Sequence, residues 1–154
     1  MLTSDPQPDH LLLACRDGSL PRTDWTHEAH LAVARVLLDE AGDPDVALGE
    51  LRGLITSYNA RSGLPDDRII CHETITRYYL GAVIALRHLP LDEVVVHPWC
   101  ARGAPLRHWS RARLDSEAAR RSWVPPDLAP LPFDHPVDPI TDMSTTTDHT
   151  GATP

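Results

Sequence analysis

The sequence has no lysine and no long hydrophobic run, and its charge is far from positive. All 14 basic residues are arginine, 22 residues are acidic, and the formal net charge is −8. Nucleic acids and anionic membrane surfaces attract basic proteins, so we expect neither as a partner. A membrane-spanning helix needs about 20 consecutive apolar residues, and no run in this sequence approaches that length. The use of arginine alone is typical of coding bias in a GC-rich bacterial genome.

Cysteine is scarce, and no secretion signal is visible. Cys15, Cys71 and Cys100 are odd in number and widely spaced, which indicates reduced thiols instead of a disulfide framework. Residues 1–9 contain no basic segment followed by an apolar one, so we expect a cytoplasmic location. The 154 residues suit one domain, because two domains of half this length would be undersized.

Apolar residues recur at helical spacing in four segments, and helix-ending residues separate these segments. The predicted helices cover residues 9–17, 26–41, 44–60 and 72–89. Gly18, Gly42 and Pro90 supply the stop signals. Thr26 and Asp43 are suitable N-caps for the second and third helices. Shorter helices are expected at residues 91–99, 107–114 and 116–121.

The sequence changes character after residue 123, because prolines recur there and a Ser/Thr-rich tail follows. Leu128, Leu131 and Phe133 are expected to hold the proline-rich part on the helices as an extended strap, and a recognition segment for a partner protein is the alternative. Residues 134–154 have no periodic apolar pattern and are predicted to be disordered. We therefore predict an all-α protein, a single compact bundle of about 4–6 helices over residues 1–133 with this strap and tail.

Two histidines at the start of the second predicted helix share one helical face. His27 and His30 are three residues apart and lie in line with the apolar stripe that begins at Leu31. A zinc-protease motif needs an i, i+4 histidine pair, whereas this pair is i, i+3, and Glu28 falls on the opposite, mostly polar face. His72 begins the apolar stripe of the fourth helix, and in an up–down–up bundle the second and fourth helices start at the same end. The sequence thus predicts three imidazoles around one point.

Three neutral imidazoles suit a divalent transition metal and leave coordination positions open for water or substrate. We therefore expect a metal-dependent enzyme that holds Zn, Fe, Ni, Cu or Mn on His27, His30 and His72. Its substrate should be a small, anionic metabolite, because two helix N-termini point at the site. Hydrolase or lyase chemistry is the first expectation and oxidase or oxygenase chemistry the second. Glu73 and Tyr58 are the candidate catalytic groups, with Glu73 as general base or fourth ligand.

Trp25, Asn59 and Arg77 complete the predicted substrate pocket at the ends of these helices. Two alternatives stay open for the histidines. They could form a metal-free pocket, used either for acid–base chemistry or for small-molecule binding by a non-catalytic helical module, or they could be hydrogen-bonded core residues. A homodimer is also left open. Metal content separates the first expectation from the others.

Four short segments of the sequence carry a family resemblance. They are Trp25–Leu31 (WTHEAHL), Tyr58–Asn59, His72–Thr76 (HETIT) and Trp123–Leu128 (WVPPDL). These motifs resemble those of a family of small helical bacterial proteins with no assigned activity, and the likeness covers most of residues 10–132. The resemblance implies a compact helical domain with a recurrent set of histidines. It brings no reaction to this chain.

Overall fold

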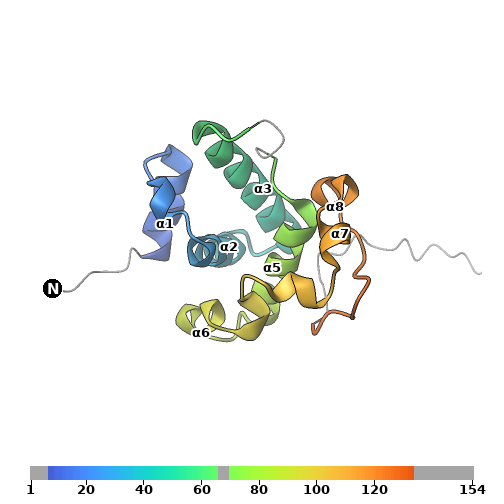
Figure 1. Cartoon of the computed structure of the whole chain (residues 1–154). Helices are drawn as coiled ribbons and strands as arrows, with labels where there is room; N and C mark the ends of the chain where they lie inside the picture. The colour runs from blue at the N-terminus through green and yellow to red at the C-terminus, as the bar shows by residue number, and fades with distance from the viewer. Residues whose placement is uncertain (1–6, 66–69, 134–154) are drawn as a thin grey trace, which may run out of the picture.

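The computed structural model describes residues 7–65 and 70–133, which form helices, turns and irregular segments without a β-strand. The predicted all-α class is confirmed (Figure 1). The longer helices are α1 (Pro8–Asp17), α2 (His27–Ala41), α3 (Pro44–Arg61) and α5 (Glu73–Ala85). The shorter ones are α6 (Leu91–Val95), α7 (Arg111–Leu114) and α8 (Glu117–Arg121). Single 3-10 turns are η1 (Arg22–Asp24), η2 (Pro98–Cys100) and η3 (Ala104–Arg107).

The ends of the first three helices agree with the sequence prediction, because local capping residues set them. The Thr26 hydroxyl accepts a hydrogen bond of 3.1 Å from the Ala29 amide at the start of α2. The Asp43 carboxylate accepts hydrogen bonds from two amides in the first turn of α3. Gly18 and Gly42 follow α1 and α2 with φ of 77° and 68°, the left-handed conformation that glycine adopts without steric cost.

Helix α5 ends earlier than predicted, and a distant side chain explains the difference. The prediction extended this helix to residue 89, whereas the structure ends it at Ala85. The Arg35 guanidinium of α2 donates hydrogen bonds to the carbonyls of Arg87 and Leu89, at 2.8 and 3.1 Å. These carbonyls are therefore satisfied outside a helix, and Pro90 disfavours a helical conformation in the residue before it. The predicted helix at 107–114 is likewise shorter and is confined to α7.

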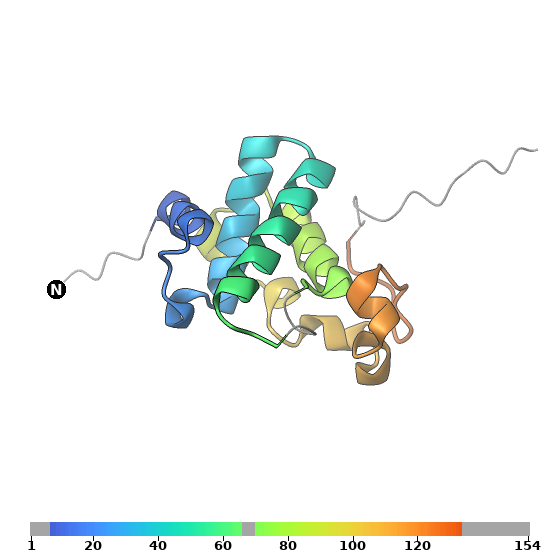
Figure 2. The ribbon, with the colours of Figure 1, turned by 90° about the horizontal axis from the view of Figure 1, so that it is seen from above.

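Helix α2 lies at the centre of the described residues and contacts α1, α3, α5 and α6. Figure 2 shows α2 and α3 side by side and antiparallel, joined by the tight turn at Gly42. The first turns of α2 and α5 lie at the same end, as the predicted up–down–up order requires. No helix within residues 7–65 and 70–133 has the length and apolar character that crossing a bilayer requires.

A second hydrophobic cluster lies on the other side of α5, around the fully buried Trp109 and Tyr78. The C-terminal strap closes this cluster. The indole Nε1 of Trp109 donates a hydrogen bond of 2.9 Å to the Val124 carbonyl, and Leu131 and Phe133 pack against the cluster. Leu128 is 59% exposed, so its side chain does not hold the strap, but its amide donates a hydrogen bond of 2.9 Å to the His108 carbonyl. The predicted disordered tail, residues 134–154, lies outside the described residues.

Candidate functional site

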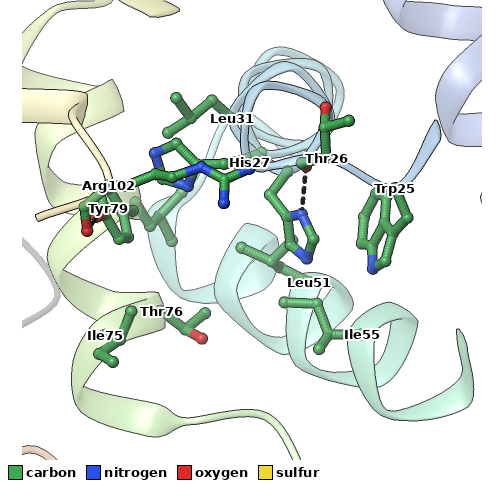
Figure 3. A pocket seen from close by; sticks show the side chains of 13 residues that line it. Trp25, Thr26, His27, Leu31, Leu51, Ile55, Ile75, Thr76, Tyr79 and Arg102 are labelled. Carbon is green, nitrogen blue, oxygen red and sulfur yellow. Dashed lines mark hydrogen bonds between the residues drawn. The ribbon is translucent and has the colours of Figure 1, made fainter. Parts of the chain in front are cut away.

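A cavity of about 510 Å³ opens between α2, α3 and α5, at the end where α2 and α5 begin (Figure 3). This volume is typical of small-molecule sites, which occupy about 300–1,000 Å³. The aliphatic part of its wall consists of Leu31, Ala34, Leu51, Ile55, Ile75 and Leu80. The aromatic and polar part includes Trp25, His27, His30, Thr76, Tyr79 and Arg102. The cavity thus has an apolar body and a small group of hydrogen-bonding side chains.

His30 presents a neutral imidazole to this cavity. Its Nδ1 atom lies 2.6 Å from the Thr26 carbonyl oxygen, and because a carbonyl only accepts, Nδ1 carries the hydrogen. Nε2 therefore has the lone pair. Burial lowers the pKa of His30 below its ordinary value, and the hydrogen bond to Thr26 only partly opposes this effect. The ring stacks on Trp25, with centroids 3.8 Å apart and 30° between the planes.

His27 has the opposite tautomer and helps to place the loop that carries Arg102. Its Nε2 atom donates to the Cys100 carbonyl at 2.6 Å, so Nδ1 is the acceptor nitrogen. The Tyr79 ring meets the His27 ring edge-on, with centroids 4.8 Å apart. The Tyr79 hydroxyl is shared between the carbonyls of Ala101 and Arg102, each at 2.8 Å. Helices α2 and α5 thereby fix residues 100–102 at the mouth of the cavity.

Arg102 is an exposed cation at this mouth, beside His27 and Tyr79 in Figure 3. Within residues 7–65 and 70–133 it forms no ion pair. Its charge still reaches Glu28, whose pKa is lowered first by a hydrogen bond from its own backbone amide and less strongly by the charge of Arg102. The Arg102 guanidinium is therefore available to an anionic group in the cavity.

Trp25 lines the cavity and brings a further donor. Its indole Nε1 is buried and has no hydrogen-bond partner in the part of the chain that the structure describes. In Figure 3 this nitrogen points toward α3. A buried donor without a partner costs about 1–3 kcal/mol. An acceptor atom on a bound molecule would remove that cost.

The structure does not bring His72 to His27 and His30. His72 is the N-cap of α5, where its Nδ1 accepts a hydrogen bond of 3.3 Å from the Ile75 amide. Its Nε2 donates to the Leu114 carbonyl at 2.8 Å, so both ring nitrogens are engaged. Among the described residues no group of three or more His, Cys, Asp or Glu side chains is placed to hold a metal ion. The predicted set of three imidazoles is not assembled there.

Glu73 and Arg77 belong to a buried ion-pair cluster on another side of α5. Glu73 is 7% exposed, and its carboxylate accepts two hydrogen bonds from Arg52 and one of 2.7 Å from Arg77 Nε. Burial alone would raise the pKa of Glu73, but the hydrogen bonds and charges of the two guanidinium groups outweigh it and lower the pKa. A carboxylate held ionised in this way is a weak proton acceptor.

Neither Tyr58 nor Asn59 lines the cavity. The Tyr58 hydroxyl donates to the Leu20 carbonyl at 2.8 Å, and only 4% of the residue is exposed. Its ring supports Trp25, with centroids 5.2 Å apart. Asn59 is half-buried near the end of α3. Of the predicted site residues, Trp25, His27 and His30 are therefore the ones that meet in the cavity.

Arg102, Thr76 and Tyr79 line the cavity but were not among the predicted site residues. Thr76 and Tyr79 belong to the apolar stripe of α5, where nothing distinguishes a cavity wall from core. Arg102 follows η2 in an irregular segment without periodicity, so no sequence signal marks it.

Comparison of the chain with protein-family models, with curated proteins and with solved structures gave no match in any of the three.

Proposed function

We propose that the protein binds a small organic acid with an apolar body in the cavity between α2, α3 and α5. One observation carries this proposal. The cavity of about 510 Å³ is largely apolar, but its wall includes the imidazoles of His27 and His30, each held in one tautomer. It also includes Arg102, which forms no ion pair among the described residues. Apolar cavities with a few convergent polar groups are the usual form of small-molecule sites.

The polar groups select the chemistry of the bound molecule. Arg102 favours a carboxylate or phosphate, because a guanidinium donates paired hydrogen bonds to such groups. The acceptor nitrogens of His27 and His30 favour a hydroxyl or N–H group on the same molecule. The aliphatic wall takes an apolar body, whose burial contributes about 25 cal/mol per Å². We also propose that the protein acts in the reducing cytoplasm, which its three free, buried cysteines support.

A metal-dependent reaction is the second candidate, and one observation favours it. Each of His27 and His30 donates one ring N–H to a backbone carbonyl, which is how metal-binding histidines are commonly oriented. Two ligands are fewer than a catalytic zinc site uses, so a bound metal would need further ligands from water or the substrate. Elemental analysis of untagged protein, with thermal melts in Zn, Fe, Ni, Cu or Mn, tests it. Neither bound metal nor a shift in melting temperature would remove this candidate.

The binding proposal is tested with a library of aliphatic and aromatic carboxylic acids, screened by ligand-detected NMR and by thermal shift on the full chain. We expect hits that lose affinity in Ile55→Trp, which narrows the cavity. Leu13→Trp is the matched control, since Leu13 is 59% exposed on α1. Circular dichroism of both variants checks that they fold. Acids that bind equally well to Ile55→Trp would refute the cavity as their site.

The role of Arg102 is tested separately with the best acid and its neutral amide. Arg102→Ala should weaken the acid about tenfold or more, since a hydrogen bond to a charged group contributes about 1.5–3 kcal/mol. The amide should be affected much less. Arg107→Ala is the control, because Arg107 is another exposed arginine of the same region. Equal losses for the acid in the two variants would show that Arg102 has no specific part in binding.

A further inference from the structure

A second cavity of about 300 Å³ adjoins the first one and shares part of its wall. His27, Tyr79 and Arg102 line both cavities. The smaller cavity is otherwise lined by η3, which contributes Pro105 and Leu106, and by α7. Arg111 begins α7, and Asp115 follows its last residue. The imidazole of His27 and the guanidinium of Arg102 therefore stand between a large, mainly apolar chamber and a smaller, charged one.

The smaller chamber contains charges of both signs. Arg102, Arg111 and Asp115 line it, and none of them forms an ion pair with any side chain in residues 7–65 or 70–133. A simple carboxylate bound here meets two guanidinium groups but is repelled by Asp115. A simple ammonium meets Asp115 but is repelled by both arginines. A head group with one negative and one positive charge matches all three side chains.

We propose that the bound molecule is an α-amino acid, or a derivative that keeps the free amino and carboxyl groups, with a bulky apolar side chain. Its carboxylate lies against Arg102 and Arg111, and its ammonium lies against Asp115. The side chain extends past His27 into the larger cavity, where the aliphatic wall and the stacked rings of Trp25 and His30 receive it. This inference rests on the proposed function, because it names the ligand class of the same site.

The size of the large cavity favours a long or aromatic side chain over a short one. Its wall draws aliphatic residues from α2, α3 and α5, so a long side chain can contact more of this wall than a short one. Small or charged amino acids would leave this apolar wall in contact with water and gain little from burial. Phenylalanine is therefore a suitable probe.

The experiment compares three probes by isothermal titration on the full chain: phenylalanine, 3-phenylpropanoate, which lacks the amine, and phenethylamine, which lacks the carboxylate. We expect phenylalanine to bind at least tenfold more tightly than either of the other two. Asp115→Asn should remove the advantage of phenylalanine over 3-phenylpropanoate. Arg111→Gln should weaken both acids together. Asp92→Asn, at an exposed carboxylate on α6, is the matched control and should change neither ratio.

The outcomes separate this inference from the proposed function. If 3-phenylpropanoate binds as tightly as phenylalanine, or if Asp115→Asn leaves their ratio unchanged, the amino-acid inference is wrong. If library acids bind in an Ile55-dependent way while phenylalanine does not bind, the proposed function stands and only this inference is overturned. If no acid binds, both are overturned.

Discussion

Replacing His72 with alanine distinguishes a structural N-cap from a ligand of the cavity. The change removes the acceptor of the Ile75 amide and the donor to the Leu114 carbonyl. Loss of an N-cap acceptor costs about 0.5–2 kcal/mol, and the 3.3 Å length places this one in the lower half. Loss of the second hydrogen bond costs about 1 kcal/mol and leaves the carbonyl of a buried leucine without its partner. The free energy of unfolding should therefore fall by about 2 kcal/mol.

Urea unfolding in the presence of a chelator, followed by tryptophan fluorescence, measures this loss. With a slope near 2 kcal/mol per molar urea, the midpoint should fall by about 1 M. His88→Ala is the control, because His88 is exposed, and it should change stability by no more than about 0.5 kcal/mol. His72→Asn keeps an acceptor at the N-cap and should recover part of the loss. The reasoning fails if His72→Ala is as stable as His88→Ala without metal and instead loses affinity for a metal.

Three further predictions concern stability. Glu73→Gln should lower the free energy of unfolding by about 2–4 kcal/mol, because it leaves Arg52 and Arg77 beside a neutral group in a partly buried site; a loss below 1 kcal/mol in urea unfolding would contradict this. Thermal melts should show stability falling as the pH drops through 6.5, because burial lowers the pKa of His30 and His72 in the folded state and the unfolded chain then binds more protons. The lowered pKa of Glu73 adds a further loss of stability below pH 4.5. A flat profile from pH 8 to 5 would refute the idea that His30 and His72 are buried as neutral imidazoles. Thr74→Val should cost about 1–3 kcal/mol, because the buried Thr74 hydroxyl donates to the Ser122 carbonyl at 2.8 Å; a calorimetric change within error would exclude that role.

Local signals in the sequence predict some of the helix ends, and tertiary contacts decide the others. Thr26, Asp43 and Gly42 act within their own turns, so they could be recognised without knowledge of the fold. The end of α5 depends on Arg35, which lies more than 50 residues earlier in the chain and binds the carbonyls that follow α5. No window along the sequence contains both partners.

The candidate site was likewise predictable only where its residues are close together in the sequence. His27 and His30 lie within one helix, so their spacing alone places them on one face. The direction of the His72 ring depends on whether the helix begins at His72 or one residue later, because successive helical residues differ by about 100° around the axis. The structure begins α5 at Glu73, and the His72 ring therefore turns back toward its own first turn and Leu114. Arg102 reaches the cavity through contacts of its backbone with Tyr79, which sequence spacing does not show.

The strap also has a consequence for the order in which the chain folds during synthesis. Ribosomes release a protein from its N-terminus, and α5 appears well before the residues that cover its outer face. Trp109 is fully buried against Trp123, and Tyr78 lies 5.5 Å from Phe133 between ring centroids. Until Trp123 and then Phe133 leave the exit tunnel, the cluster around Trp109 and Tyr78 on the outer face of α5 is incomplete. The helix that supplies a third of the cavity wall is thus secured by the last described residues to be made.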